Sequence, residues 1–218
     1  MKIVIPEDLS EITLDQYQRF SQVEGDDNFM LLKMVEIFCN VPLRDVALIP
    51  LKELDEIITM INKAFEKKRK FKTRFTLDGV EYGFIPELES ITFGEYVDLE
   101  MYIGKVEDLH KLLAILYRPI TIKNRDLYDI EEYKADANGG HNMRQVPLDI
   151  ALEAPSFFFH LGNELLNSLA DSLSKEKLTT QEKQILEENG VGIKQFTQSL
   201  KEIYSSSTRL LQSDFMSV

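Results

Sequence analysis

The sequence predicts an α+β fold that is mostly helical and carries a small antiparallel β element. Along most of the chain, apolar residues recur at intervals of three and four, which is typical of amphipathic helices. One stretch changes to a period of two on both sides of Asp78-Gly79, as in a β-hairpin. With 218 residues, of which 44% are hydrophobic, the chain can build one large domain or two small ones around a real core.

The first part of the chain predicts a strand followed by helices. Thr13 with Gln16 has the spacing of a capping box, in which each side chain satisfies a backbone N–H of the other residue. Pro42 marks a helix end, because proline disfavours helix in the residue before it. The predicted elements are a short strand at 2–5 stopped by Pro6, a helix beginning at Thr13, a second helix capped by Asp27, and an amphipathic helix over 51–65.

The β-hairpin is predicted at 71–85, and helices follow it. Phe71, Thr73 and Phe75 alternate with cationic residues, and Asp78-Gly79 supplies the tight turn. Thr92 and Glu95 form a second capping box, which opens one helix, and a further helix is predicted over 106–116. The N-terminal strand is expected to join the hairpin.

Two stretches of the chain, 5–42 and 85–119, resemble each other. Ile5-Pro6-Glu7 matches Ile85-Pro86-Glu87, and the two capping boxes are each followed by a second helix that ends near a proline. Duplication of one strand, turn, helix, helix unit would explain the match. Reuse of the same capping chemistry at two unrelated strand-to-helix turns would explain it equally well.

The remainder of the chain is predicted to be irregular and then helical. We expect an irregular segment at 124–136, a flexible loop at 137–142, and a helical segment from Pro147 that Pro155 breaks or kinks. Beyond it, Leu161, Leu165, Leu169 and Leu173 stripe a long helix, Thr179 and Glu182 cap the next, and 193–203 forms the last before a tail at 205–218. We therefore expect an α+β core, 1–146, and a C-terminal helical region with a docking tail, 147–218, which either packs on that core or forms a second lobe.

Charge and composition exclude several classes of function. The net charge of −12 argues against nucleic acid as a general partner. Apolar stretches are far shorter than the roughly 20 residues of a membrane helix, so no membrane contact is expected. The beginning of the chain lacks the apolar region of a secretory signal, and the single cysteine, Cys39, favours a reducing cytoplasm.

No standard catalytic or cofactor motif stands in the sequence. A phosphate-binding glycine loop, a zinc-protease helix, a Cys-x-x-Cys pair and a nucleophile elbow are all missing. Cys39, His110 and His160 fit core positions better than catalytic ones, and His141 alone stands in a mobile setting. We therefore expect no enzymatic activity, no cofactor and no metal.

A basic cluster and an aromatic run are the candidate protein interfaces. Lys70, Lys72 and Arg74 share the hairpin face opposite the phenylalanines. They fit either a solvated edge that discourages aggregation or a contact with an acidic protein, and nucleic acid is the weakest reading. The other candidates are Phe157, Phe158 and Phe159, of which two can face a core, and the tail residues Leu210, Leu211 and Phe215.

In combination, these segments resemble a group of small proteins of tailed bacteriophages, especially the crAss-like phages of gut Bacteroidetes. The resemblance rests on 5–20, on the hairpin into Phe84-Ile85-Pro86, on 91–99, on Leu116-Tyr117-Arg118-Pro119-Ile120, and on Pro147-Leu148-Asp149 leading to Phe157. It covers about three quarters of the chain, and each motif alone is weak. It implies a virion structural or assembly protein, assembled in the host cytoplasm.

Within that context, two roles compete. A ring or adaptor component of the head–tail connector or tail would form homo-oligomers and contact portal, tail or ring proteins. A tail-assembly chaperone would coat another protein and then leave the particle. Opposed charged faces, an aromatic helix interface and a docking tail favour the virion component.

Overall fold

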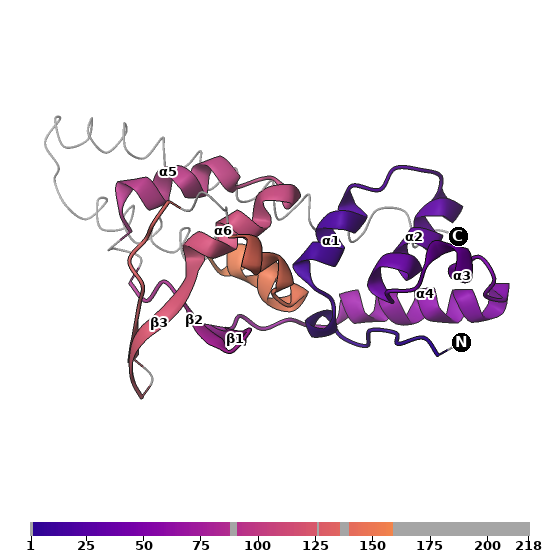
Figure 1. Cartoon of the computed structure of the whole chain (residues 1–218), viewed down its shortest axis with the longest axis horizontal. Helices are drawn as coiled ribbons and strands as arrows, with labels where there is room; N and C mark the ends of the chain where they lie inside the picture. Colours follow the sequence, from indigo (N-terminus) through magenta and orange to yellow (C-terminus); the bar gives the residue numbers. More distant parts are fainter. Residues whose placement is uncertain (1, 88–90, 126, 136–139, 159–218) are drawn as a thin grey trace, which may run out of the picture.

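The computed structural model describes residues 2–87, 91–125, 127–135 and 140–158. It confirms the predicted α+β fold, mostly helical with one antiparallel sheet. Helices α1 to α4 form one half of the molecule, and the sheet with α5 and α6 forms the other (Figure 1). A helix over 148–158 lies between the two halves, and both contribute to one continuous hydrophobic core.

The N-terminal half is helical from its first element onward. Its elements are η1 (Leu9–Glu11), α1 (Leu14–Ser21), α2 (Asp27–Phe38), α3 (Leu43–Val46) and α4 (Leu51–Glu66). The Thr13–Gln16 capping box is present as predicted, whereas α2 is capped by Asp26 instead of Asp27. The Asp26 carboxylate accepts a hydrogen bond from the Phe29 N–H at 2.8 Å.

The strand predicted at 2–5 is absent from the structure. Ile3 and Ile5 pack partly buried against the hydrophobic core, and Pro6 is buried after them. The alternation of polar and apolar residues in this segment therefore serves packing beside the helices and not pairing in the sheet. Figure 1 shows the segment running alongside α4, away from the sheet.

The sheet has four antiparallel strands in the order β1-β2-β3-β4. The predicted hairpin is confirmed as β1 (Arg74–Leu77) and β2 (Val80–Phe84). Its turn residues, Asp78 and Gly79, have φ of 49° and 80°, the left-handed pair that a two-residue turn needs to match strand twist. The strands β3 (Tyr117–Asn124) and β4 (Leu127–Ile130) complete the sheet.

The second hairpin contradicts the expectation of an irregular segment from residue 124. Pro119 lies within β3, where a proline normally argues against a strand because it has no N–H to donate. Here the Pro119 carbonyl accepts the Glu131 N–H at 2.9 Å, and Pro119 stands opposite Tyr82 of β2. The strand therefore forms because neighbours on both sides hold it.

Helices α5 (Phe93–Tyr102) and α6 (Leu109–Leu116) pack together, with the short η3 (Val106–Asp108) between them. The predicted Thr92–Glu95 capping box opens α5. The last residue of α6, Leu116, is followed directly by the first residue of β3. The Leu116 carbonyl accepts the Ile85 N–H at 2.9 Å, which ties the helix to the end of β2.

The third residue of α1 links the start of that helix to the end of the next. The Gln16 Oε1 atom accepts the Thr13 N–H at 2.9 Å, and its Nε2 donates to the Ile37 carbonyl at 2.8 Å, in the last turn of α2. Gln16 is buried, so both bonds form away from water.

Glu95 likewise links the cap of α5 to the end of the following helix, but its partner there is a charged side chain. Its Oε2 accepts the Thr92 N–H at 2.7 Å, and its Oε1 pairs at 2.8 Å with Arg118 Nη2, just beyond the end of α6. The two units thus share a buried N-terminal residue that ties cap to helix end. A strand precedes only the second unit, so the common architecture is the helix pair and its cap.

The segment after residue 140 joins the two halves. The Leu148 N–H donates to the Ile12 carbonyl at 2.8 Å, and the Leu14 N–H donates to the Val146 carbonyl at 2.9 Å. Helix 148–158 continues through Pro155, which therefore does not end it. The described part of the predicted C-terminal region thus packs on the same core as the first half.

Candidate protein interaction surface

The basic cluster, Lys70, Lys72 and Arg74, lies just before and at the start of β1, and Lys72 and the neighbouring Arg69 pair with helix 148–158. Lys72 Nζ lies 2.7 Å from Asp149 Oδ2, and Arg69 Nε lies 2.9 Å from Glu153 Oε1. Asp149 and Glu153 are four residues apart, so they share one helix face. Some of the cationic side chains in this region, which the sequence predicts to contact a partner protein, therefore form ion pairs within the same chain.

The three predicted contact residues occupy different environments. Lys72 is half exposed and ion-paired, Lys70 is exposed, and the Arg74 guanidinium lies 5.7 Å from the centre of the Tyr128 ring. Within the described structure, Lys72 is held by an ion pair, whereas Lys70 is exposed on the surface. A contact by this face stays a prediction.

Reversing the charge of Lys72 should destabilise the chain before any partner is considered. We expect Lys72→Glu to lower the free energy of unfolding by about 1 kcal/mol, because it places two carboxylates together on a half-buried pair. Lys70→Glu should change stability by less than about 0.5 kcal/mol. Urea unfolding measures both variants, and Lys72→Glu with Asp149→Lys should recover most of the loss. Equal stability of the two single variants would contradict the pairing.

The two described members of the aromatic run, Phe157 and Phe158, pack into the core of this chain. The Phe157 ring stacks on Phe71 with centroids 3.7 Å apart and meets the edge of Phe84 at 5.6 Å. Phe158 is buried. Two of the three aromatics therefore face the core, as the sequence predicts, and they offer little surface to a partner. Phe159, Leu210, Leu211 and Phe215 lie outside the described residues.

Helix α5 carries an exposed apolar line that the sequence prediction missed. Phe93, Val97 and Met101 are 81%, 38% and 56% exposed and follow one another at four-residue spacing. The opposite face buries Leu99 and Ile103. The spacing was readable in the sequence, but only the tertiary structure decides which of two apolar faces is covered. We call Phe93, Val97 and Met101 the α5 stripe.

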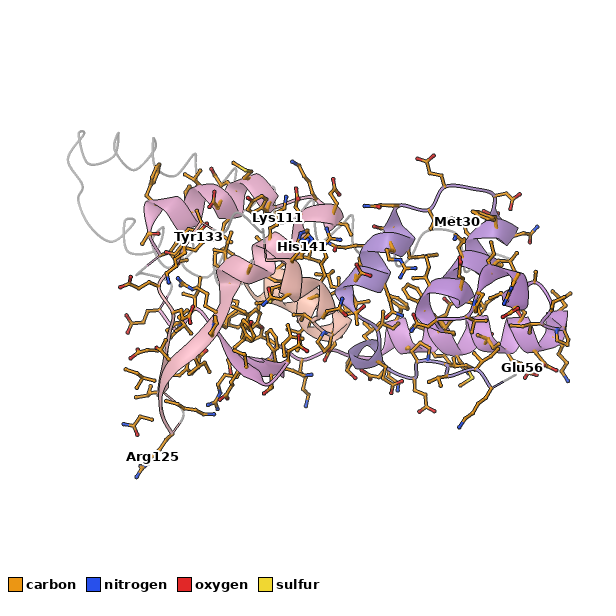
Figure 2. All side chains as sticks on the ribbon, viewed as in Figure 1. Met30, Glu56, Lys111, Arg125, Tyr133 and His141 are labelled. Atoms are coloured by element: carbon orange, nitrogen blue, oxygen red, sulfur yellow. The ribbon has the colours of Figure 1, made fainter. Side chains whose placement is uncertain are left out.

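Two further pairs of exposed apolar residues lie at opposite ends of the molecule. Leu48 and Leu51 are largely exposed where α3 gives way to α4. Ile122 and Leu127 are largely exposed on the β3–β4 hairpin. They lie on the same face of the sheet, because Leu127 stands opposite Asn124, and Asn124 is two residues from Ile122 along β3. In Figure 2, the Arg125 label marks the tip of that hairpin, far from α4.

A buried polar cluster joins α1 to α6. Gln18 and His110 are both 2% exposed. Gln18 Nε2 donates to the carbonyls of Val106 at 2.7 Å and Glu107 at 3.0 Å, and it lies 3.2 Å from His110 Nδ1. The amide cannot turn over, because its oxygen would then face two carbonyl oxygens.

This arrangement favours a neutral imidazole. Burial, with smaller contributions from the nearby Arg144 and Lys111 charges, lowers the pKa of His110 to about 4. A proton on Nδ1 would also point at the amide hydrogens of Gln18. The turn at 140–145 lies next to this cluster: the ring centroid of His141 is 6.2 Å from that of His110, which belongs to α6. Residues 140–142 of the loop expected at 137–142 belong to this turn, and 137–139 lie outside the described residues.

Other candidate chemistry is sparse in the part of the chain that the structure describes. Among these residues, no group of three or more His, Cys, Asp or Glu side chains is placed to hold a metal ion. Cys39 is buried, and burial raises the pKa of its thiol to about 11, which makes the reactive thiolate scarce. None of the described helices combines the length and apolar character needed to cross a membrane.

Comparisons of the chain with protein-family models, with curated proteins and with solved structures return no match. The described residues carry several exposed apolar surfaces. These surfaces are the α5 stripe and the exposed leucines and isoleucine at the two ends of the molecule.

Proposed function

We propose that this chain is a non-enzymatic structural protein of a tailed-bacteriophage virion, a ring or adaptor component of the head–tail connector or tail. It acts through protein–protein contacts with copies of itself and with portal, tail or ring proteins. It takes no cofactor, and it enters the particle during assembly in the host cytoplasm. The phage context comes from the resemblance of its motifs.

The observation that carries the proposal is the placement of exposed apolar residues at both ends of the molecule. Leu48 and Leu51 lie at the helical end, and Ile122 and Leu127 lie on the far hairpin (Figure 1). Contacts between unlike faces generate rings of identical copies when the rotation closes. Two different apolar ends are the minimum that such a head-to-tail contact needs.

Mass spectrometry of purified particles tests the virion role. We expect the intact chain at several copies per particle, a stoichiometry that a closed ring requires. Its presence in infected-cell lysate together with its absence from particles would overturn the proposal and favour an assembly chaperone. Particles stripped of loosely bound protein with high salt serve as the control for adsorption.

A surface variant tests the contact itself. Replacing Leu48 and Leu51 by serine should change the free energy of unfolding by less than about 0.5 kcal/mol, because both are exposed in the isolated chain. Their burial against a neighbour would contribute about 3 kcal/mol or more, so incorporation into particles should fall roughly a hundredfold. Lys52→Ser, on the same helix turn, is the matched control. Normal incorporation of the leucine variant would exclude this end as an interface.

A further inference from the structure

Helix α5 has a face that the described structure leaves uncovered. The α5 stripe holds three of the large exposed apolar side chains, more than any other described element. Their four-residue spacing places them in one row, about 12 Å long. Apolar rows of this kind on a surface helix mark a packing site for another helix.

The spacing of this row is also the spacing found where two helices pack together. Side chains four residues apart make the ridge that fits between the ridges of a second helix. Glu100 borders the row and accepts a hydrogen bond from the Tyr96 hydroxyl at 2.7 Å, so a polar edge flanks the apolar centre. Helix α5 therefore has a face that is suited to pack against a second helix.

Beyond its last described residue, the sequence of the chain predicts helices with apolar stripes that could pack against the α5 stripe. Leu161, Leu165, Leu169 and Leu173 repeat the same four-residue spacing, and Ile193, Phe196, Leu200 and Ile203 stripe the final predicted helix. We propose that the α5 stripe is covered by the C-terminal segment of the same chain, residues 159–203, packed helix against helix. This contact lies within one molecule and does not depend on the proposed virion role.

The path from the end of helix 148–158 to α5 is short. Phe157 contacts Phe84 at the end of β2, and nine residues of chain lead from Phe84 to Phe93. With the contact between Phe157 and Phe84 included, the distance from Phe157 to Phe93 is at most about 40 Å, which some twelve extended residues span. Because the segment is tethered, its local concentration at the stripe lies in the millimolar range, which favours it over a free partner.

Photo-crosslinking of the full chain tests the proposal. A benzophenone side chain in place of Phe93 keeps an aromatic ring at the stripe, and peptide mapping identifies what it contacts. We expect adducts to residues 159–203 within a band of single-chain mass. The same probe at Leu127, which is also exposed, should give no adduct to that segment.

The other outcomes overturn the proposal. Adducts in a two-chain band would show that a neighbouring copy covers the stripe, and adducts elsewhere or none at all would show that the segment does not. A second variant tests the same contact without the benzophenone side chain, which could itself disturb the packing. Val97→Asp should lower the unfolding midpoint of the full chain by roughly 4 to 8 °C if the stripe is covered, whereas Leu127→Asp should leave it unchanged. Equal midpoints would count against coverage.

Discussion

Replacing Glu95 by alanine should lower the free energy of unfolding by about 4 kcal/mol, the largest single loss that we expect. Glu95 is 2% exposed, and its carboxylate serves both the cap of α5 and the mostly buried Arg118 side chain, whose Nη2 lies 2.8 Å away. The variant leaves the mostly buried Arg118 without this counter-charge, which costs far more than a lost surface pair. Urea unfolding followed by circular dichroism measures the change.

Three variants separate the charge from the cap. Thr92→Ala removes only the hydroxyl of the cap and should cost about 1 kcal/mol. Gln16→Ala breaks the equivalent neutral link in α1 and should cost about 2 kcal/mol. Glu95→Leu with Arg118→Met removes both charges and should be less destabilised than Glu95→Ala. If Glu95→Ala costs no more than Thr92→Ala, the ion pair contributes nothing.

Acid should destabilise the chain through His110 between about pH 6.5 and pH 4. The folded pKa of about 4 lies below the ordinary value of 6.5, so the unfolded chain binds the proton first as the pH falls. The stabilising contribution is therefore complete above pH 6.5 and is lost as the pH falls to about 4. The shift corresponds to about 3 kcal/mol.

A comparison of variants isolates this effect from the carboxylates that titrate in the same range. The stability difference between the native chain and His110→Gln should shrink by about 3 kcal/mol from pH 7 to pH 4, since glutamine does not titrate. His141→Gln, at an exposed histidine, is the matched control variant. A constant difference across this range would show that His110 is not held neutral.

Short-range chemistry made much of the fold predictable. The capping boxes at Thr13 and Thr92 and the Asp78-Gly79 turn each satisfy backbone groups within four residues, so they form wherever they occur. Apart from the cap of α2, which is Asp26 and not Asp27, the predictions that were wrong concern pairing across the chain. The segment 2–5 and the strand containing Pro119 have local patterns that point the opposite way from their structures.

The candidate site shows the same division. Lys72 looked like a free surface cation because its partner, Asp149, stands more than seventy residues away in the chain. That Phe157 is one of the aromatics that face the core depends in the same way on the distant Phe71. The α5 stripe was overlooked because α5 has two apolar faces, and sequence periodicity does not say which one a neighbour covers.

The sequence alone determined the mostly helical α+β fold class, the first residues of the main helices and the position of the first hairpin. These features depend on hydrogen bonds between residues that are close together in the chain. Only the tertiary structure decided that the basic cluster pairs with helix 148–158, that β3 and β4 complete the sheet, and that α5 keeps an apolar face exposed. Burial and ion pairing depend on which distant segments meet, and that is a property of the packed chain.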